Sequence, residues 1–163
     1  MKQNKKGFTL IELLAVIVVL ALVMILAVPA ILTAANNAKQ KTFQMYGQKL
    51  VEAAVTQFES QQLLGLGSTK TYKGSGLDTP PYCYTIDDLG ISAQGSFQGF
   101  VEVRPSTLIG DDNKNKTEYL VHLTDTTYAY TGISSNDVQN NPGIISKSAE
   151  DINKVITAIQ ACS

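Results

Sequence analysis

The sequence has little of several residue types on which common functional sites depend. It contains one histidine, two cysteines and no tryptophan among 163 residues. The cysteines, Cys83 and Cys162, match no metal-ligand spacing, and neither belongs to a C-x-x-C pair. Basic and acidic residues nearly balance, 13 against 14, so no basic excess indicates nucleic-acid binding. We therefore predict neither a metal, nor a cofactor, nor a direct nucleic-acid site.

Catalytic patterns are equally scarce. The single histidine, His122, falls in a predicted strand, in opposite phase to its apolar neighbours, and no motif pairs it with a nucleophile. It is either half exposed or packed. The pair Gly65 and Gly67 lacks the lysine and the following helix start of a phosphate-binding loop. We predict that the chain is not an enzyme.

One stretch has part of a calcium-loop pattern. Asp111, Asn113 and Asn115 have the D-x-N-x-N spacing with which such a loop begins. The glycine expected at the sixth position is Lys116, and the glutamate expected at the twelfth is His122. A solvated turn between strands is the favoured interpretation, and a weak calcium site is the alternative.

What the sequence does have is a long apolar run near its start. No charge and no hydrogen-bonding side chain occurs from Leu13 to Leu32. A helix of 20 residues, at about 1.5 Å per residue, covers the roughly 30 Å hydrocarbon core of a bilayer. Lys2, Lys5 and Lys6 precede the run, so the positive-inside bias places the N-terminus in the cytoplasm.

Two simple interpretations compete for this run. A secretory signal peptide has a shorter apolar region that ends at a small-residue cleavage site. A plain single-span anchor fits the hydropathy but leaves Glu12 unexplained. A carboxylate beside an apolar span costs a few kcal/mol unless it is neutralised, paired or near the interface. On physical grounds alone, a position of Glu12 at headgroup level stays open.

The stretch KKGFTLIELL, from Lys5 to Leu14, resembles the class III signal of type IV prepilins and pseudopilins. The resemblance implies that a prepilin peptidase cleaves between Gly7 and Phe8 and that Phe8 is then N-methylated. It makes Glu12 the signature acid at the fifth mature position, which would pair with the Phe8 amine of a neighbouring subunit and set the assembly register. The resemblance covers about the first 40 residues and is only architectural beyond them.

The resemblance implies a structural subunit, a major pilin of a type IV pilus that supports adhesion, motility or DNA uptake. Its partners would be copies of itself, the prepilin peptidase, a platform protein and an assembly ATPase, with minor pilins as further candidates. The precursor would cross the inner (cytoplasmic) membrane once with its N-terminus inside, and later form an extracellular surface filament. The alternatives are a pseudopilin of a type II secretion or competence system and, from another class, a membrane-anchored binding or enzymatic domain.

The helical pattern continues beyond the apolar run, which predicts one helix over residues 8–64. Its second half has an apolar stripe at three- and four-residue steps, formed by Phe43, Tyr46, Leu50, Ala54 and Phe58. Pro29 lacks a backbone donor, so we expect a kink or local melting near Leu26–Ala30. Many pilins have a proline at the matching place, and a merely tolerated membrane-helix proline is the alternative. Gly47 is a second predicted weak point.

The remainder predicts a small antiparallel meander followed by a helix. The strand candidates are 82–86, which is a strand or a turn, 97–104, 118–124 and 127–131, with a tight turn at Asp125-Thr126 between the last two. Ser148 and Asp151 resemble a capping box before a C-terminal helix. The predicted fold class is α+β, with the long N-terminal helix packed on the sheet.

We divide the chain into a prepilin leader over residues 1–7, a hydrophobic transmembrane and filament-core half-helix over 8–34, and a globular pilin head over 35–163 that includes the amphipathic half-helix.

The two cysteines bracket the predicted sheet. Because export is predicted, we expect a Cys83–Cys162 disulfide. A closed loop of about 80 residues corresponds to roughly 4–5 kcal/mol of stabilisation in the chain-entropy model. Many pilins have a C-terminal disulfide, although the spacing here is wider than in that pattern. Two free or separately buried thiols are the alternative.

Overall fold

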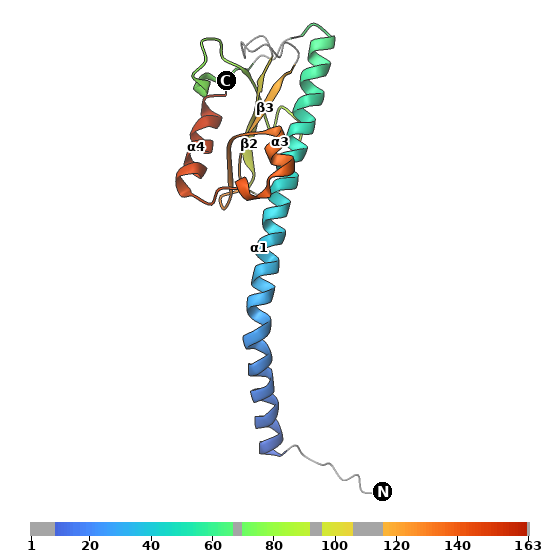
Figure 1. Cartoon of the computed structure of the whole chain (residues 1–163), viewed down its shortest axis with the longest axis vertical. Coiled ribbons are helices and arrows are strands. Elements are labelled where there is room, and N and C mark those ends of the chain that lie inside the picture. Colours follow the sequence, from blue (N-terminus) through green and yellow to red (C-terminus); the bar gives the residue numbers. More distant parts are fainter. Residues whose placement is uncertain (1–8, 67–69, 92–95, 106–115, 163) are drawn as a thin grey trace. The chain divides into compact units, whose positions relative to one another are not determined.

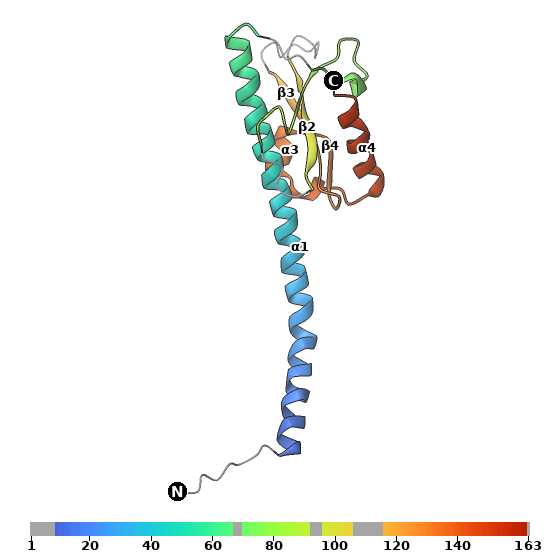
Figure 2. The ribbon, with the colours of Figure 1, turned by 180° about the vertical axis from the view of Figure 1, so that it is seen from behind.

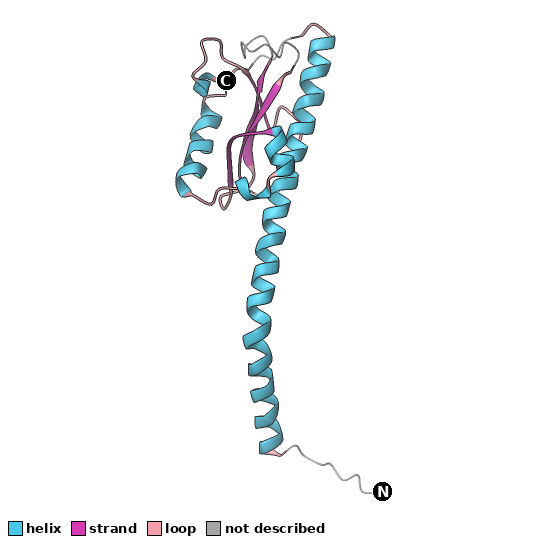
Figure 3. Ribbon diagram, viewed as in Figure 1, coloured by secondary structure: helices cyan, strands magenta, loops and turns pink. Residues whose placement is uncertain are grey.

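The computed structural model describes residues 9–66, 70–91, 96–105 and 116–162 (Figure 1). The chain divides into two compact units, Met1–Lys39 and Gln40–Ser163. The second unit, called the head below, contains a four-stranded sheet and several helices (Figure 3). This arrangement confirms the predicted α+β class.

The long helix α1 extends from Leu10 to Leu63, close to the predicted 8–64. Its C-terminus has the hydrogen bonds of a Schellman motif. The Leu66 amide donates to the Gln61 carbonyl at 2.8 Å, and the Gly65 amide donates to the Gln62 carbonyl at 3.2 Å. Gly65 adopts a φ of 67°, which a residue with a side chain would reach only with strain. This glycine therefore ends α1.

The sheet is the predicted antiparallel meander. Its strands are β1 (Tyr82–Thr85), β2 (Gln98–Arg104), β3 (Glu118–Thr124) and β4 (Ala129–Ser134), in the spatial order β1-β2-β3-β4. Aromatic and β-branched residues fill these segments, which suits a pleated and mostly buried sheet. The open interpretation of residues 82–86 is settled as a strand that ends at Thr85.

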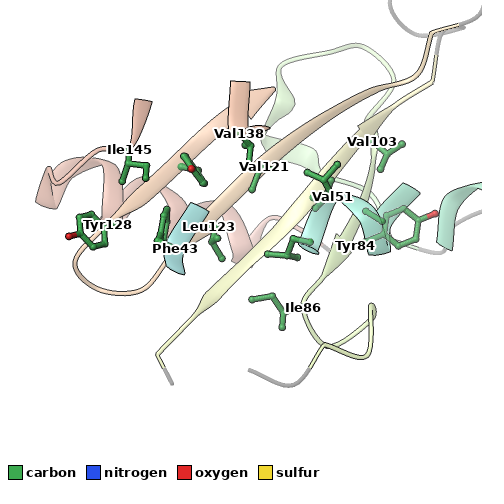
Figure 4. Close-up of a cluster of buried hydrophobic side chains, with 14 of the residues drawn as sticks. Phe43, Val51, Tyr84, Ile86, Val103, Val121, Leu123, Tyr128, Val138 and Ile145 are labelled. Carbon is green, nitrogen blue, oxygen red and sulfur yellow. The ribbon is translucent and has the colours of Figure 1, made fainter. Parts of the chain in front are cut away.

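The head part of α1 packs on one face of the sheet. The predicted apolar stripe is confirmed, since Phe43, Leu50, Ala54 and Phe58 are buried and Tyr46 packs against the same cluster. Figure 4 shows Phe43 and Val51 of α1 among sheet residues. The sheet contributes Tyr84, Val101, Val103, Val121, Leu123 and Tyr130. Burial of each large side chain is worth about 1.5–3 kcal/mol, so this cluster is the main core.

A second helix covers the opposite face of the sheet. Helix α4 (Ala149–Gln160) lies alongside the strands in the head, and Val155 is its fully buried residue (Figure 2). Phe100 alternates with Val101 along β2, so the two side chains point to opposite faces. Phe100 belongs to a smaller apolar cluster that is completed by Tyr72, Cys83 and Cys162. The sheet is thus covered on both faces.

Some short elements differ from the prediction. Helix α3 (Ser135–Asn140) was not predicted, because among its residues only Val138 is buried and its pattern is polar. Ser134 and Asp137 start it, with the Asp137 amide donating to the Ser134 hydroxyl at 3.2 Å. Two single-turn 3₁₀ helices occupy Lys73–Ser75 and Pro142–Ile144.

The predicted two-residue turn between the last strands is wrong. Strand β4 begins at Ala129 rather than Thr127, and residues 125–128 form the connection. The Asp125 carboxylate accepts the amides of Thr127 and Tyr128 at 2.9 and 2.7 Å, which stabilises the longer loop. The other end of β4 extends to Ser134 through an irregularity opposite Val121 and His122.

The predicted capping box of the last helix is only half correct. Ser148 does cap α4, because its hydroxyl accepts the Glu150 amide at 3.2 Å. The Asp151 carboxylate instead accepts the Ser146 hydroxyl at 2.6 Å and lies near Lys154. In a capping box, Asp151 would accept the Ser148 amide; here it accepts the hydroxyl of Ser146, two residues before the cap.

Candidate functional site

The first part of α1 has an unusually apolar and uncovered surface. From Leu10, which is 84% exposed, to Leu32, which is 59% exposed, every large apolar side chain of the segment is exposed. Among the described residues, α1 is the one helix long and apolar enough to cross a membrane. A helix that is apolar on all sides needs lipid or other protein around it. The segment is therefore the first candidate functional site.

Thr9 and Glu12 form a capping box at the start of α1. The Glu12 carboxylate accepts the Thr9 amide at 2.8 Å and the Thr9 hydroxyl at 2.9 Å. The Glu12 amide in turn donates to the Thr9 hydroxyl oxygen at 3.3 Å. This role of Thr9 was missed, although its T-x-x-E spacing is the signature of such a box. Within a single chain, the Glu12 carboxylate thus has local partners.

The predicted processing residues, Gly7 and Phe8, lie outside the described residues. Pro29 lies inside α1, which stays helical through it rather than melting over Leu26–Ala30. Pro29 has no amide hydrogen, so the normal helical bond to the Ile25 carbonyl is missing. The Thr33 hydroxyl donates to the Pro29 carbonyl at 3.0 Å in the next turn. The function of Pro29 as a soft point stays a prediction.

The two cysteines are joined in the head, as predicted. Cys83 of β1 and Cys162, just after α4, form a disulfide with a Cα–Cα distance of 5.9 Å and a sequence separation of 79. Tyr72 pairs with Cys162 in an isolated β-bridge, and the Lys73 amide donates to the Ala161 carbonyl at 3.2 Å. The end of α4 is therefore tied to the first strand and to the loop before it.

A polar cluster lies between the sheet and α4. Glu102 of β2 is 1% exposed, and its carboxylate accepts the Arg104 guanidinium N–H at 2.6 Å. His122 Nε2 lies 3.2 Å from the other carboxylate oxygen. Burial alone would raise the pKa of Glu102, but the hydrogen bonds from His122 and Arg104, together with the Arg104 charge, outweigh burial and lower it. Glu102 is thus held ionised.

Of the two open interpretations of His122, the packed one is correct. Its ring stacks on Phe100 with a centroid distance of 4.5 Å and an interplanar angle of 3°, and the Tyr72 ring lies 5.4 Å away. Sequence reasoning missed Glu102 as its partner. Phe100 and Glu102 are two residues apart in a predicted strand, so their shared face could have been read from the sequence, but strand pairing was needed to bring Glu102 to His122.

Within this cluster the negative charge of Glu102 is compensated by the Arg104 guanidinium. Glu102 and His122 are both buried. In the described part of the chain, no three His, Cys, Asp or Glu residues are grouped as metal ligands. The calcium-like spacing at Asp111, Asn113 and Asn115 lies outside the described residues. The cluster therefore contributes to the stability of the head.

Comparison with known families identifies the start of the chain. Residues 2–28 match the family model of the prokaryotic N-terminal methylation motif, the class III signal of type IV pilins. Searches of the curated proteins and of the solved structures found no match. The motif supports a type IV pilin-like or pseudopilin protein, a class that is structural rather than enzymatic. It implies processing by a prepilin peptidase, and with the apolar helix it supports membrane anchoring.

Proposed function

We propose that this chain is a structural subunit, a major pilin, of a type IV pilus. One observation carries the proposal: the methylation motif of residues 2–28 overlaps a helical segment whose large apolar side chains are all exposed. A motif for processing at the membrane, joined to an uncovered apolar surface, fits a chain that moves from lipid into a bundle of its own copies.

The proposed cycle begins with cleavage between Gly7 and Phe8 and methylation of Phe8. The apolar part of α1 then rests in the membrane until an assembly ATPase and a platform protein drive its extraction. Burial of each large apolar side chain between neighbouring helices contributes about 1.5–3 kcal/mol, which keeps the bundle together once lipid is lost. Pro29 provides a local weakness in the helix for this step.

Glu12 directs the register of assembly in this proposal. Its carboxylate would accept the Phe8 amine of a neighbouring chain, because an unpaired charge in an apolar bundle is costly. The capping box with Thr9 supports this role, since it holds the carboxylate at the helix start. Both bonds from Thr9 reach the same carboxylate oxygen, Oε2, and no hydrogen bond from the described residues reaches Oε1.

Two measurements test this function, one on the native protein and one on a variant. Mass analysis of the N-terminus should find methylated Phe8 as the first residue, and an intact lysine-rich leader would overturn the proposal. The second is the filament yield of Glu12→Ala. This variant should insert into the membrane normally but yield at least about tenfold fewer filaments, because a buried Phe8 amine without its carboxylate partner costs several kcal/mol. Glu52→Ala removes an exposed carboxylate of the same helix and is the matched control.

The nearest alternative is a pseudopilin of a type II secretion or competence system, which shares the same N-terminal features. Abundance separates the two, because a major pilin forms long surface filaments and a pseudopilin short, confined fibres. Electron microscopy of cells, with the chain labelled in its head, distinguishes these outcomes. A membrane-anchored binding domain, the alternative from another class, predicts the uncut leader.

A further inference from the structure

A groove runs beside α4 in the head. One side is formed by α4, and the other by Tyr72, Gly74 and Thr131. Figure 2 shows α4 and β4, the strand that contains Thr131, next to each other in the head. The groove has a volume of about 570 Å³ and is open to solvent. Pockets of roughly 300–1,000 Å³ are typical of small-molecule sites.

The floor of this groove is apolar. Ala158 and Ala161 of α4 leave space beside the Tyr72 ring, because they have the smallest side chains. Gly74 is required for the position of that ring. A Cβ at residue 74 would lie 2.7 Å from Tyr72 Cζ and Oη, closer than real Cβ atoms come. The glycine thus lets the ring lie directly against the backbone.

The rim of the groove is polar and carries no net charge. Asn153 and Lys154 lie three and four residues after Glu150, and Thr157 lies four and three residues after them, so all four share one face of α4. Glu150 and Lys154, the only charged side chains among the described residues that line the groove, form an ion pair of 2.9 Å. The Asn153 carboxamide and the Thr157 hydroxyl offer both donors and acceptors.

We propose that this groove binds a neutral sugar unit of an oligosaccharide. A pyranose ring has an apolar C–H face, which fits the floor, and hydroxyl groups at its edge, which fit the rim. Because the rim charges compensate one another, the groove has no excess charge with which to select a phosphate or a nucleic acid. The open shape admits one unit of a longer chain. This site does not depend on filament assembly and adds a ligand class to the head.

The test uses the full chain in micelles of a zwitterionic detergent without a sugar headgroup. Saturation-transfer NMR is recorded with maltose, lactose, cellobiose and N-acetyllactosamine at millimolar concentrations, and with the charged probes sialyllactose and glucose 6-phosphate. We expect transfer to at least one neutral sugar. Asn153→Ala and Thr157→Val should each weaken binding about three- to tenfold, the effect of one lost hydrogen bond. Gln160→Ala, at an exposed position of α4 outside the groove, should not.

Three outcomes would overturn the assignment. The first is no transfer to any neutral sugar. The second is transfer that both groove variants keep at the level of the Gln160→Ala control, which indicates an adventitious contact. The third is transfer to charged probes alone, which indicates an anion site. None of them bears on the pilin proposal, which is tested by the N-terminal mass.

Discussion

Glu102 Oε2 and His122 Nε2 lie 3.2 Å apart, although the two residues are not partners in the sheet register. Phe100 pairs with His122, and Leu120 pairs with Glu102, so the contact is diagonal across β2 and β3. Arg104 lies on the same face as Glu102, two residues further along β2, and its guanidinium binds the other carboxylate oxygen. A buried carboxylate thus receives one donor from each of two strands.

Glu102→Gln should destabilise the head by about 1.5–3 kcal/mol, the range for a hydrogen bond to a charged group. Gln keeps the shape of the side chain and removes the negative charge that pairs with the Arg104 guanidinium. Denaturant unfolding of the full chain in micelles, followed by circular dichroism, measures the effect. Glu118→Gln is the matched control, because Glu118 lies 3.7 Å from the same arginine but its side chain is 42% exposed. That variant should lose about 1 kcal/mol or less.

The same carboxylate should make the head sensitive to acid. The folded protein lowers the pKa of Glu102 below its ordinary value of 4.5. At pH values between the lowered pKa and 4.5, Glu102 binds a proton in the unfolded chain but not in the folded chain. The free energy of unfolding therefore falls as pH falls below 4.5. The contribution is complete above that value. Glu102→Gln should flatten this part of the pH profile, and equal slopes in the two proteins would contradict the assignment.

Loss of the disulfide should weaken the attachment of α4. Cys83→Ala with Cys162→Ala opens a loop of 79 residues, and the chain-entropy model gives a loss of roughly 4–5 kcal/mol. Unfolding of the double variant measures the loss. Thiol labelling of the native protein without reductant should find no reactive cysteine, and two labelled thiols would contradict the bond.

Gly47→Ala should destabilise the head, although alanine is the better helix former by about 1 kcal/mol. An added Cβ would lie 3.0 Å from Tyr130 Cε2 and 3.2 Å from Val138 Cγ1. Overpacking of this kind costs about 1–3 kcal/mol. Gly47→Ala combined with Val138→Ala relieves one of the two contacts and should show a smaller penalty than the sum of the separate changes. Lys49→Ala is the exposed control on the same helix.

Thr126→Asn should stabilise the β3–β4 connection. Thr126 has a φ of 73°, the left-handed region that a β-branched residue adopts only with strain. Asparagine tolerates this conformation better, so a gain of up to about 1 kcal/mol is expected. Thermal unfolding measures it, and Thr127→Asn in the same loop is the control. A loss of stability at residue 126 would show that the threonine side chain contributes more than its strain costs.

Local patterns in the sequence were sufficient for the long elements. The apolar run and the stripe after it predicted α1 to within two residues at either end, because a helix repeats its faces every 3.6 residues regardless of its surroundings. The aromatic and β-branched residues of 97–104 likewise predicted β2 closely, and the alternation over 118–124 predicted β3. The motif around Gly7 and Glu12 is local as well, since a short run of neighbouring residues is enough to identify it.

The sequence by itself thus determined the helix, the two central strands and the processing motif, since each rests on neighbours along the chain. Only the tertiary structure decided that α4 covers the face of the sheet opposite α1. The meeting of Glu102 with His122, the groove beside α4 and the close contact of Gly47 with Tyr130 each join residues far apart in sequence. Such contacts depend on strand register and helix placement, which no local period encodes.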